Sequence, residues 1–329
     1  MALPEDANKI AEDIRRMRIR GAGLIARSAV EALRIVAERS RASDIDGFMK
    51  DLNDAAQILL QTRPTAVSLP NGIRYVMHRV NAQLATAASV TQIRSATLKI
   101  SDEFINDAKN AVHRIGEIGA RRIRNGDVLL THCNSSAAIS VMKTAWNQGT
   151  RFKVYVTETR PRFQGHLTAK ELSSAGIPVT MILDDAVRYF MQDVDKVLVG
   201  ADAITANGAL VNKIGTSVVA LAAHEAKVRF FVAAETYKFS PETMIGELVK
   251  IEERDPNEMV SQGALKNIGP ISIRNPSFDV TPPEYIDLII TERGIIPPLG
   301  AILILEEVFG VVTPEELREY QTYALHEEA

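Results

Sequence analysis

The sequence has little that would support a disulfide framework, a zinc cluster or a nucleic-acid surface. Cysteine occurs once among 329 residues, which excludes an internal disulfide and a zinc site built from several thiolates. The six histidines show no spacing that favours metal binding, so we expect no metal and no resident cofactor. Aromatic residues make up only 5%, and Lys+Arg 38 against Asp+Glu 41 leaves a net charge of -3. We therefore expect no nucleic-acid partner.

Long hydrophobic runs are also missing. No apolar stretch reaches the roughly 18 residues that a membrane span requires, and the segment from Met1 to Arg20 is charged and lacks the apolar core of a signal peptide. We therefore expect a cytoplasmic protein without a membrane partner. The contents of 46% hydrophobic and 24% charged residues are typical of a globular protein, and the length suits one large domain or two ordinary ones.

Hydrophobic periodicity divides the chain into two parts. Residues 1–124 have apolar residues at helical spacing, as at Ile25, Ala29, Leu33 and Val36, which predicts a helical N-terminal domain. Residues 125–329 alternate apolar, β-branched runs with helix-capable segments, which predicts a Rossmann-like α/β domain with a parallel sheet covered on both faces. The predicted strands are 128–130, 154–156, 179–182, 197–199, 230–232 and 288–291, and the predicted closing helices are 299–308 and 314–323.

The lone cysteine lies in the stretch Asp127–Ala138, where an apolar run is followed by small polar residues and then by a helix-capable segment. The turn that leaves the carboxyl end of a parallel strand is where such sheets bind ligands. Ser135 and Ser136 favour the start of a helix, whose free N–H groups can bind an anion. We expect the positive helix end to favour the thiolate of Cys133. The alternative is that Cys133 is a small buried hydrophobic residue.

Asp202 follows another predicted strand, residues 196–200, and should therefore share a rim of the sheet with Cys133. A thiol and a carboxyl at one rim can divide the roles of base and acid between them. The alternative interpretation is that Asp202 caps the turn that follows.

Four positive residues lie near turns that can face one rim: Arg20, Arg63, Lys213 and Lys238. Arg20 precedes Gly21-Ala22-Gly23 at a helix start, where a guanidinium and backbone N–H groups can converge on an anion, although a plain helix–helix turn is the alternative. Asn212 and Lys213 precede another helix and could form a phosphate cradle, or Lys213 could be a solvated loop residue. Four cations indicate a substrate with two phosphates.

These motifs together resemble one family over residues 18 to 300. Arg20–Gly23, Arg63–Ala66, Cys133–Ser136, Gly200–Asp202, Asn212–Gly215 and Ile251–Arg254 occur in the order found in the sugar-phosphate isomerases related to the alpha, beta and delta subunits of the translation initiation exchange factor. The resemblance implies a helical N-terminal domain followed by a Rossmann-like domain.

Three branches of this family compete. Methylthioribose-1-phosphate isomerases share the cysteine and the aspartate but carry a Ser-Thr-type sequence where this chain has Glu235–Phe239. The regulatory exchange-factor subunits share that Glu-Thr-Tyr-Lys-Phe run and lack the catalytic pair. The archaeal ribose-1,5-bisphosphate isomerases have both features, as this chain does, and it resembles them most.

The resemblance implies an aldose–ketose isomerase that converts α-D-ribose 1,5-bisphosphate to D-ribulose 1,5-bisphosphate, with Cys133 as base and proton carrier and Asp202 as acid. Lys238 is expected to read the 5-phosphate, because it lies in the stretch that differs from the methylthioribose branch. The family also implies homo-oligomers, commonly hexamers built as trimers of dimers, and activation by AMP in nucleotide degradation. The substrate-binding residues that the resemblance implies are Arg20, Gly21, Ala22, Gly23, Arg63, Ser135, Ser136, Ala137, Asn212, Lys213 and Lys238.

Overall fold

A computed structural model describes residues 3–19, 21–63, 66–85, 87–260, 269 and 271–309. Contacts divide these residues into a helical unit, drawn from the described residues of 3–110, 237–246 and 305–309, and an α/β unit, drawn from those of 111–236 and 247–304. The division falls inside one long helix. The two-domain division predicted between residues 124 and 125 stays a prediction.

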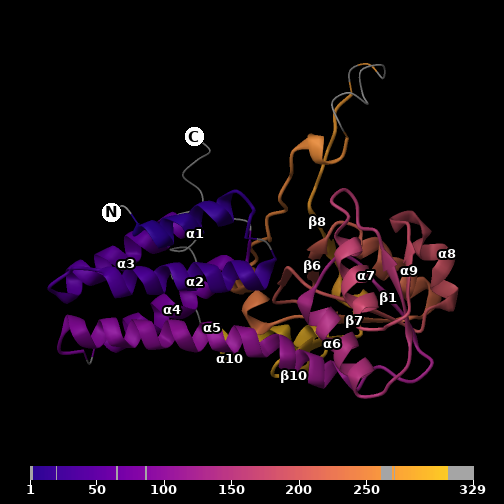
Figure 1. Cartoon of the computed structure of the whole chain (residues 1–329), viewed down its shortest axis with the longest axis horizontal. Helices are drawn as coiled ribbons and strands as arrows, with labels where there is room; N and C mark the ends of the chain where they lie inside the picture. The colour runs from indigo at the N-terminus through magenta and orange to yellow at the C-terminus, as the bar shows by residue number, and fades with distance from the viewer. Residues whose placement is uncertain are drawn as a thin grey trace. The chain divides into compact units, whose positions relative to one another are not determined.

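The helical unit is built around its second helix (Figure 1), which packs against the first, third and fourth helices. Arg34 of the second helix also donates a hydrogen bond to Asp102 of the fifth at 2.8 Å. The predicted apolar positions Ile25, Ala29, Leu33 and Val36 are all buried on that helix, so the helical periodicity is confirmed. Asp44 caps the third helix by accepting a hydrogen bond from the Gly47 N–H at 2.7 Å. The helices are α1 (Glu5–Arg15), α2 (Ala22–Arg39), α3 (Ile45–Leu60), α4 (Ser68–Leu84) and α5 (Val90–Ala120).

A seven-stranded sheet forms the centre of the α/β unit, with the order β10-β9-β7-β4-β1-β2-β3. All pairs are parallel except β10 with β9. Its strands are β1 (Val128–Thr131), β2 (Lys153–Thr157), β3 (Val179–Ile182), β4 (Lys196–Val199), β7 (Arg229–Ala233), β9 (Leu288–Thr291) and β10 (Gly294–Ile296). The six predicted strands and the predicted fold class, a helical region followed by a mostly parallel α/β domain, are therefore confirmed.

Helices connect these strands, as the right half of Figure 1 shows. The α-helices of this part of the chain are α6 (Ser136–Asn147), α7 (Gln164–Ser174), α8 (Val187–Phe190), α9 (Thr216–Ala226) and α10 (Ala301–Phe309). Short 3₁₀ turns are η1 (Asp184–Ala186), η2 (Met191–Asp193), η3 (Thr236–Lys238), η4 (Pro241–Ile245), η5 (Pro256–Glu258), η6 (Pro283–Tyr285) and η7 (Pro298–Gly300). The closing helix predicted at 299–308 is confirmed as α10, whereas the one predicted at 314–323 lies outside the described residues.

A second, antiparallel sheet has the order β5-β6-β8 and is not predicted by the sequence analysis. Its strands are β5 (Ala203–Ile204), β6 (Leu210–Lys213) and β8 (Phe278–Thr281). Because β6 pairs with a strand more than sixty residues ahead in the chain, local periodicity does not reveal it. Asn212 and Lys213 thus lie on a buried strand, so the solvated-loop interpretation of Lys213 is wrong.

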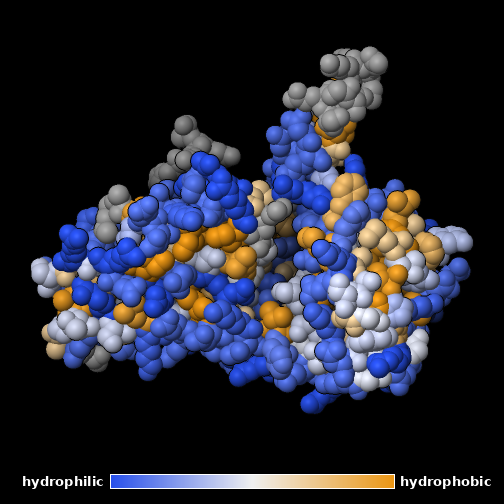
Figure 2. Space-filling model, in the orientation of Figure 1, coloured by the Kyte–Doolittle hydropathy of each residue, from blue (hydrophilic) through white to orange (hydrophobic). Residues whose placement is uncertain are grey.

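Within the described ranges, no helix has the length and hydrophobicity that crossing a membrane requires. Figure 2 shows mostly hydrophilic residues on the visible face of each unit, with hydrophobic residues gathered in a band over the helical unit and in patches on the α/β unit. On α9, for example, Val218 is 59% and Leu221 is 44% exposed.

Candidate active site

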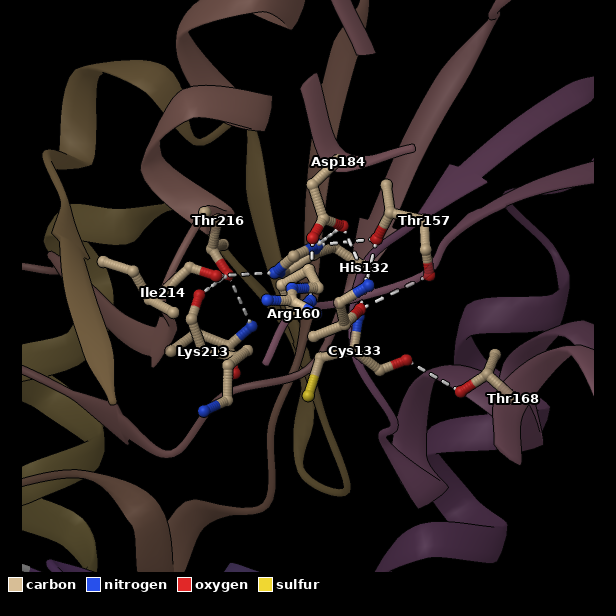
Figure 3. Close-up of polar contacts among 12 residues, drawn as sticks. His132, Cys133, Thr157, Arg160, Thr168, Asp184, Lys213, Ile214 and Thr216 are labelled. Atoms are coloured by element: carbon tan, nitrogen blue, oxygen red, sulfur yellow. Dashed lines mark hydrogen bonds and ion pairs between the residues drawn. The ribbon is translucent and has the colours of Figure 1, made fainter. Parts of the chain in front are cut away.

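Cys133 occupies the turn between β1 and α6 in a strained backbone conformation. Its φ of 70° is left-handed, which is uncommon for a residue other than glycine. Two threonine hydroxyls bond its backbone. The Cys133 N–H donates to Thr159 Oγ1 at 2.9 Å, and Thr168 Oγ1 donates to the Cys133 carbonyl at 2.7 Å (Figure 3). Strained residues persist where their surroundings over-determine them, and they cluster at functional sites.

The turn after β2 supplies one of these hydroxyls and is itself held by a carboxylate. Thr159 has a φ of 62°, and it is fully buried. Asp184, in η1 beyond β3, accepts the backbone N–H groups of Thr159 at 2.8 Å and Arg160 at 2.7 Å. The carboxyl ends of three neighbouring parallel strands therefore meet around Cys133, as the rule for open α/β sheets predicts.

The pKa of the Cys133 thiol is raised to about 12. Burial is the main cause, and the negative charges of Asp202 and Asp184 add to it. The Asn134 N–H and the ammonium of Lys213 act in the opposite direction without overcoming these effects. The expectation that the helix end favours the thiolate is therefore wrong for the unliganded protein, because burial and nearby carboxylates outweigh it.

Asp202 lies between β4 and β5, at the carboxyl end of β4 as predicted. Its backbone N–H donates to the Val211 carbonyl at 3.0 Å, and its side chain is half-buried. It is close enough to Cys133 to raise the pKa of the thiol. The sequence-predicted thiol and carboxyl thus share one rim of the sheet.

Lys213 is the cation that the structure brings to this pair. Its side chain is buried, and its Nζ lies 5.4 Å from the centre of the Phe278 ring. Burial lowers the pKa of Lys213, and Arg254 adds to this effect, while Cys133 and Asp202 oppose it. The neighbouring Asn212 donates a side-chain hydrogen bond to Thr216 Oγ1 at 3.0 Å.

The predicted phosphate cradle at the start of α9 is already filled by Asp279. This carboxylate accepts the backbone N–H of Gly215 at 2.7 Å, the backbone N–H of Ser217 at 3.2 Å and the Ser217 hydroxyl at 2.9 Å. Burial raises the pKa of Asp279, and these hydrogen bonds oppose that rise. The expectation of free N–H groups is therefore wrong for Gly215, which leaves the Asn212 and Lys213 side chains to contact an anion there.

The start of α6 agrees with the sequence prediction. Ser135 is the N-cap residue, and its side chain accepts the Ala138 N–H at 3.3 Å. Ser136 and Ala137 begin the helix, and the first turn carries no acidic residue. These three predicted ligand-binding residues therefore stand at a helix N-terminus next to Cys133.

The remaining predicted residues belong to the helical unit. Gly21 precedes α2 with a φ of 82°, a conformation that glycine adopts readily, and Ala22 and Gly23 form the first turn. Ser68, the first residue of α4, donates its hydroxyl to the Ala22 carbonyl at 2.8 Å. This bond connects the starts of α2 and α4, and Arg63 lies on the connection that leads from α3 to α4. Arg20 lies outside the described residues.

Lys238 is buried in η3, and the backbone on both sides of it is bonded to one side chain. The Asn71 amide donates to the Tyr237 carbonyl at 2.9 Å and to the Phe239 carbonyl at 2.7 Å. Arg74 donates to the Asn71 side-chain oxygen at 2.9 Å and pairs with Glu242. The orientation of the amide is thus fixed by a buried ion pair.

Sequence reasoning missed the polar residues that surround Cys133, namely His132, Thr157, Thr159, Thr168 and Asp184. Thr157 and Thr159 lie at the end of a predicted strand next to β1, so the strand-end rule that identified Cys133 could also have identified them. His132 was considered only as a metal ligand. Among the residues that the structure describes, no cluster of His, Cys, Asp and Glu is arranged to hold a metal ion.

Comparison with known proteins decides the family. Residues 18–298 match the Initiation factor 2 subunit family. The chain belongs to this family. It is 57% identical to the ribose 1,5-bisphosphate isomerase of Thermococcus kodakarensis over 311 residues, which cover 94% of this chain and 97% of the relative.

Solved structures of the Initiation factor 2 subunit family show the same fold. A translation initiation factor eIF-2B structure from Pyrococcus horikoshii OT3 has a TM-score of 0.77 and 34% identity, covering 91% of this chain and 100% of that one. A 5-methylthioribose 1-phosphate isomerase structure from the same organism has a TM-score of 0.73 and 32% identity, covering 93% and 88%. The resemblance to the isomerases of this family, and the prediction of an enzyme, are confirmed by the relatives.

Proposed function

We propose that this protein is a sugar-phosphate isomerase that converts α-D-ribose 1,5-bisphosphate to D-ribulose 1,5-bisphosphate. The observation that carries the proposal is the pair of Cys133 and Asp202 at one sheet rim, in a chain 57% identical to a ribose 1,5-bisphosphate isomerase. The chemistry needs such a pair, because the anomeric oxygen carries phosphate and the ring cannot open by simple loss of a hydroxyl proton.

In the proposed reaction, Asp202 protonates the ring oxygen as the bond from C1 to that oxygen breaks. Cys133 removes the proton from C2, which leaves an enol phosphate with a C1–C2 double bond. Cys133 then returns its proton to C1, and the C2 hydroxyl proton passes to the Asp202 carboxylate as the ketone forms. Both residues thereby recover the protonation state in which they began.

The reactive state holds the same number of protons as the resting state. At rest the thiol is protonated, since its pKa is about 12, and the carboxylate of Asp202 raises that pKa. Moving one proton from Cys133 to Asp202 gives a thiolate base and a carboxylic acid without exchange with solvent. We propose that substrate binding favours this transfer by excluding water.

For substrate binding we propose the residues named by the motif resemblance. Ser135, Ser136 and Ala137 offer the N-terminus of α6, and Asn212 and Lys213 offer side-chain donors. The proposed substrate-binding residues of the helical unit are Gly21, Ala22 and Gly23 at the start of α2, together with Arg20, Arg63 and Lys238. Lys238 is proposed to read the 5-phosphate.

We further propose a homo-oligomer, a hexamer built as a trimer of dimers, with AMP as an activator in nucleotide degradation in the cytoplasm. Exposed apolar residues such as Val218 and Leu221 on α9 support contact with further chains. The oligomer is checked by light scattering on the purified protein, and the activator by turnover with and without AMP.

The deciding experiment is turnover of ribose 1,5-bisphosphate, with methylthioribose 1-phosphate assayed in parallel. Product from the bisphosphate alone, lost in Cys133→Ser and Asp202→Asn, supports the proposal. Turnover of the methylthio sugar alone would assign the chain to the other isomerase branch, to which the P. horikoshii structure with a TM-score of 0.73 belongs. Binding without turnover would favour a regulatory subunit, the second alternative within the family.

A further inference from the structure

His132 lies between two turns of the α/β unit, and the proposed chemistry gives it no step. Its side chain is 2% exposed, and both ring nitrogens are bonded. Nδ1 lies 2.7 Å from Thr157 Oγ1, and Nε2 lies 2.9 Å from the Ile214 carbonyl oxygen (Figure 3). Thr157 lies next to Thr159, whose hydroxyl accepts the Cys133 N–H, and Ile214 directly follows Lys213 in the chain.

The partners of His132 fix which nitrogen carries hydrogen. A carbonyl oxygen only accepts, so Nε2 donates to Ile214, and Nδ1 of the neutral ring accepts from the Thr157 hydroxyl. Two charged groups face the ring, namely Asp184, whose Oδ1 lies 3.9 Å from Nδ1, and Lys213. Burial lowers the pKa of His132, the Ile214 carbonyl and Asp184 oppose this, and Lys213 adds to it. The imidazole is therefore neutral at pH 7.

A series of hydrogen bonds connects this ring to Cys133. Thr159 Oγ1 lies 3.2 Å from the Thr157 hydroxyl oxygen and 3.4 Å from the Thr157 carbonyl oxygen, so Thr157 offers it two acceptors. Thr159 Oγ1 in turn accepts the Cys133 N–H at 2.9 Å. Both threonine side chains are fully buried, where hydrogen bonds are electrostatically stronger than in water.

On the other side, the turn after Lys213 passes directly against the imidazole. Gly215 has a φ of 100°, and a Cβ placed there would lie 3.1 Å from Cε1 and 3.2 Å from Nε2 of His132. A side chain at this position would therefore push the ring and the turn apart. Because Gly215 has no side chain, the turn can approach the imidazole closely enough for the hydrogen bond between Nε2 and the Ile214 carbonyl.

We infer that His132 is a positioning residue that holds the Cys133 turn and the Lys213 turn at one fixed separation, so that the ammonium stays beside the thiol. The consequence for the chemistry is electrostatic. The charge of Lys213 lowers the pKa of Cys133 against the larger effects that raise it. The inference rests on the proposed function only where Cys133 is taken as the proton carrier.

A double-mutant cycle on thiol alkylation tests this coupling. Cys133 is the only cysteine of the chain, so iodoacetamide labelling at pH 8 reports on it alone. Lys213→Met, which keeps the buried volume, should slow alkylation about tenfold in the wild-type background, because one pKa unit changes the thiolate fraction tenfold. In His132→Asn, which cannot reach Ile214, the same substitution should slow it less than about threefold. Equal slowing in both backgrounds, or none in wild type, would overturn the inference.

Two further variants separate positioning from general folding. His132→Gln keeps an N–H near the place of Nε2 and should retain most of the Lys213 effect, whereas loss of the effect there would contradict a role for the Ile214 bond. His113→Asn, on an exposed face of α5, is the matched control and should change nothing. In turnover, His132→Asn should lower kcat and leave KM unchanged. If wild type fails to turn over the bisphosphate, the proposed function fails while the alkylation cycle still decides the coupling.

Discussion

The rate of the proposed isomerisation should not depend on pH between about 7.5 and 9.5, although its base is a thiol that hardly ionises there. With a pKa of about 12, only about one thiol in 10⁵ is ionised at pH 7, which corresponds to about 7 kcal/mol. If Cys133 had to lose its proton to solvent before each turnover, kcat/KM would rise about tenfold per pH unit, or about 100-fold over this range.

Transfer of the thiol proton to Asp202 predicts a different profile. The reactive and resting states then contain the same number of protons, so their ratio is independent of pH between the two pKa values. We expect kcat/KM for ribose 1,5-bisphosphate to stay within about twofold across the range. The assay is initial-rate formation of ribulose 1,5-bisphosphate in buffers of constant ionic strength, above the second pKa of the substrate phosphates.

A slope of one in the plot of log kcat/KM against pH would refute the shared proton and, with it, the role of Asp202 as the acid. Asp202→Gln is the matched variant for a flat wild-type profile, because the glutamine amide cannot accept the proton of Cys133. Any residual turnover in that variant should rise with pH, because its thiol must ionise to solvent.

Two other outcomes follow from the contacts described above. Asp202→Asn removes a negative charge that raises the pKa of Cys133, so it should abolish turnover and yet speed iodoacetamide labelling of that thiol about tenfold at pH 8. An unchanged or slower labelling rate would contradict this electrostatic account. Asn71→Leu removes two hydrogen bonds to buried carbonyls beside Lys238 and a third from Arg74, at about 1 kcal/mol each. The free energy of unfolding in urea should fall by about 3 kcal/mol and KM for the bisphosphate should rise, whereas Asn81→Leu, exposed on the same helix, should alter neither.

The sequence predicted the parts of this structure that depend on neighbouring residues. Continuous apolar runs identified the six parallel strands, and the position of Cys133 after one of them placed the thiol at the sheet rim. The sign of its pKa shift could not be predicted, because burial, the main cause, depends on segments far apart in the chain that pack around the thiol. The sheet of β5, β6 and β8 was missed for the same reason, since its pairing joins Leu210 to Thr281.

The same distant pairing changes how phosphate recognition should be understood. Sequence reasoning expected three helix starts to offer free N–H groups, and the partial positive charge of a helix N-terminus attracts any anion, including one from the protein. At α9 that anion is Asp279, which β8 carries to the Gly215 N–H. The first turns of α2 and α6 have no acidic residue. In the α/β unit we therefore expect a phosphate to meet a helix N-terminus without an acidic residue at α6, whereas at α9 only the Asn212 and Lys213 side chains are left to donate to an anion.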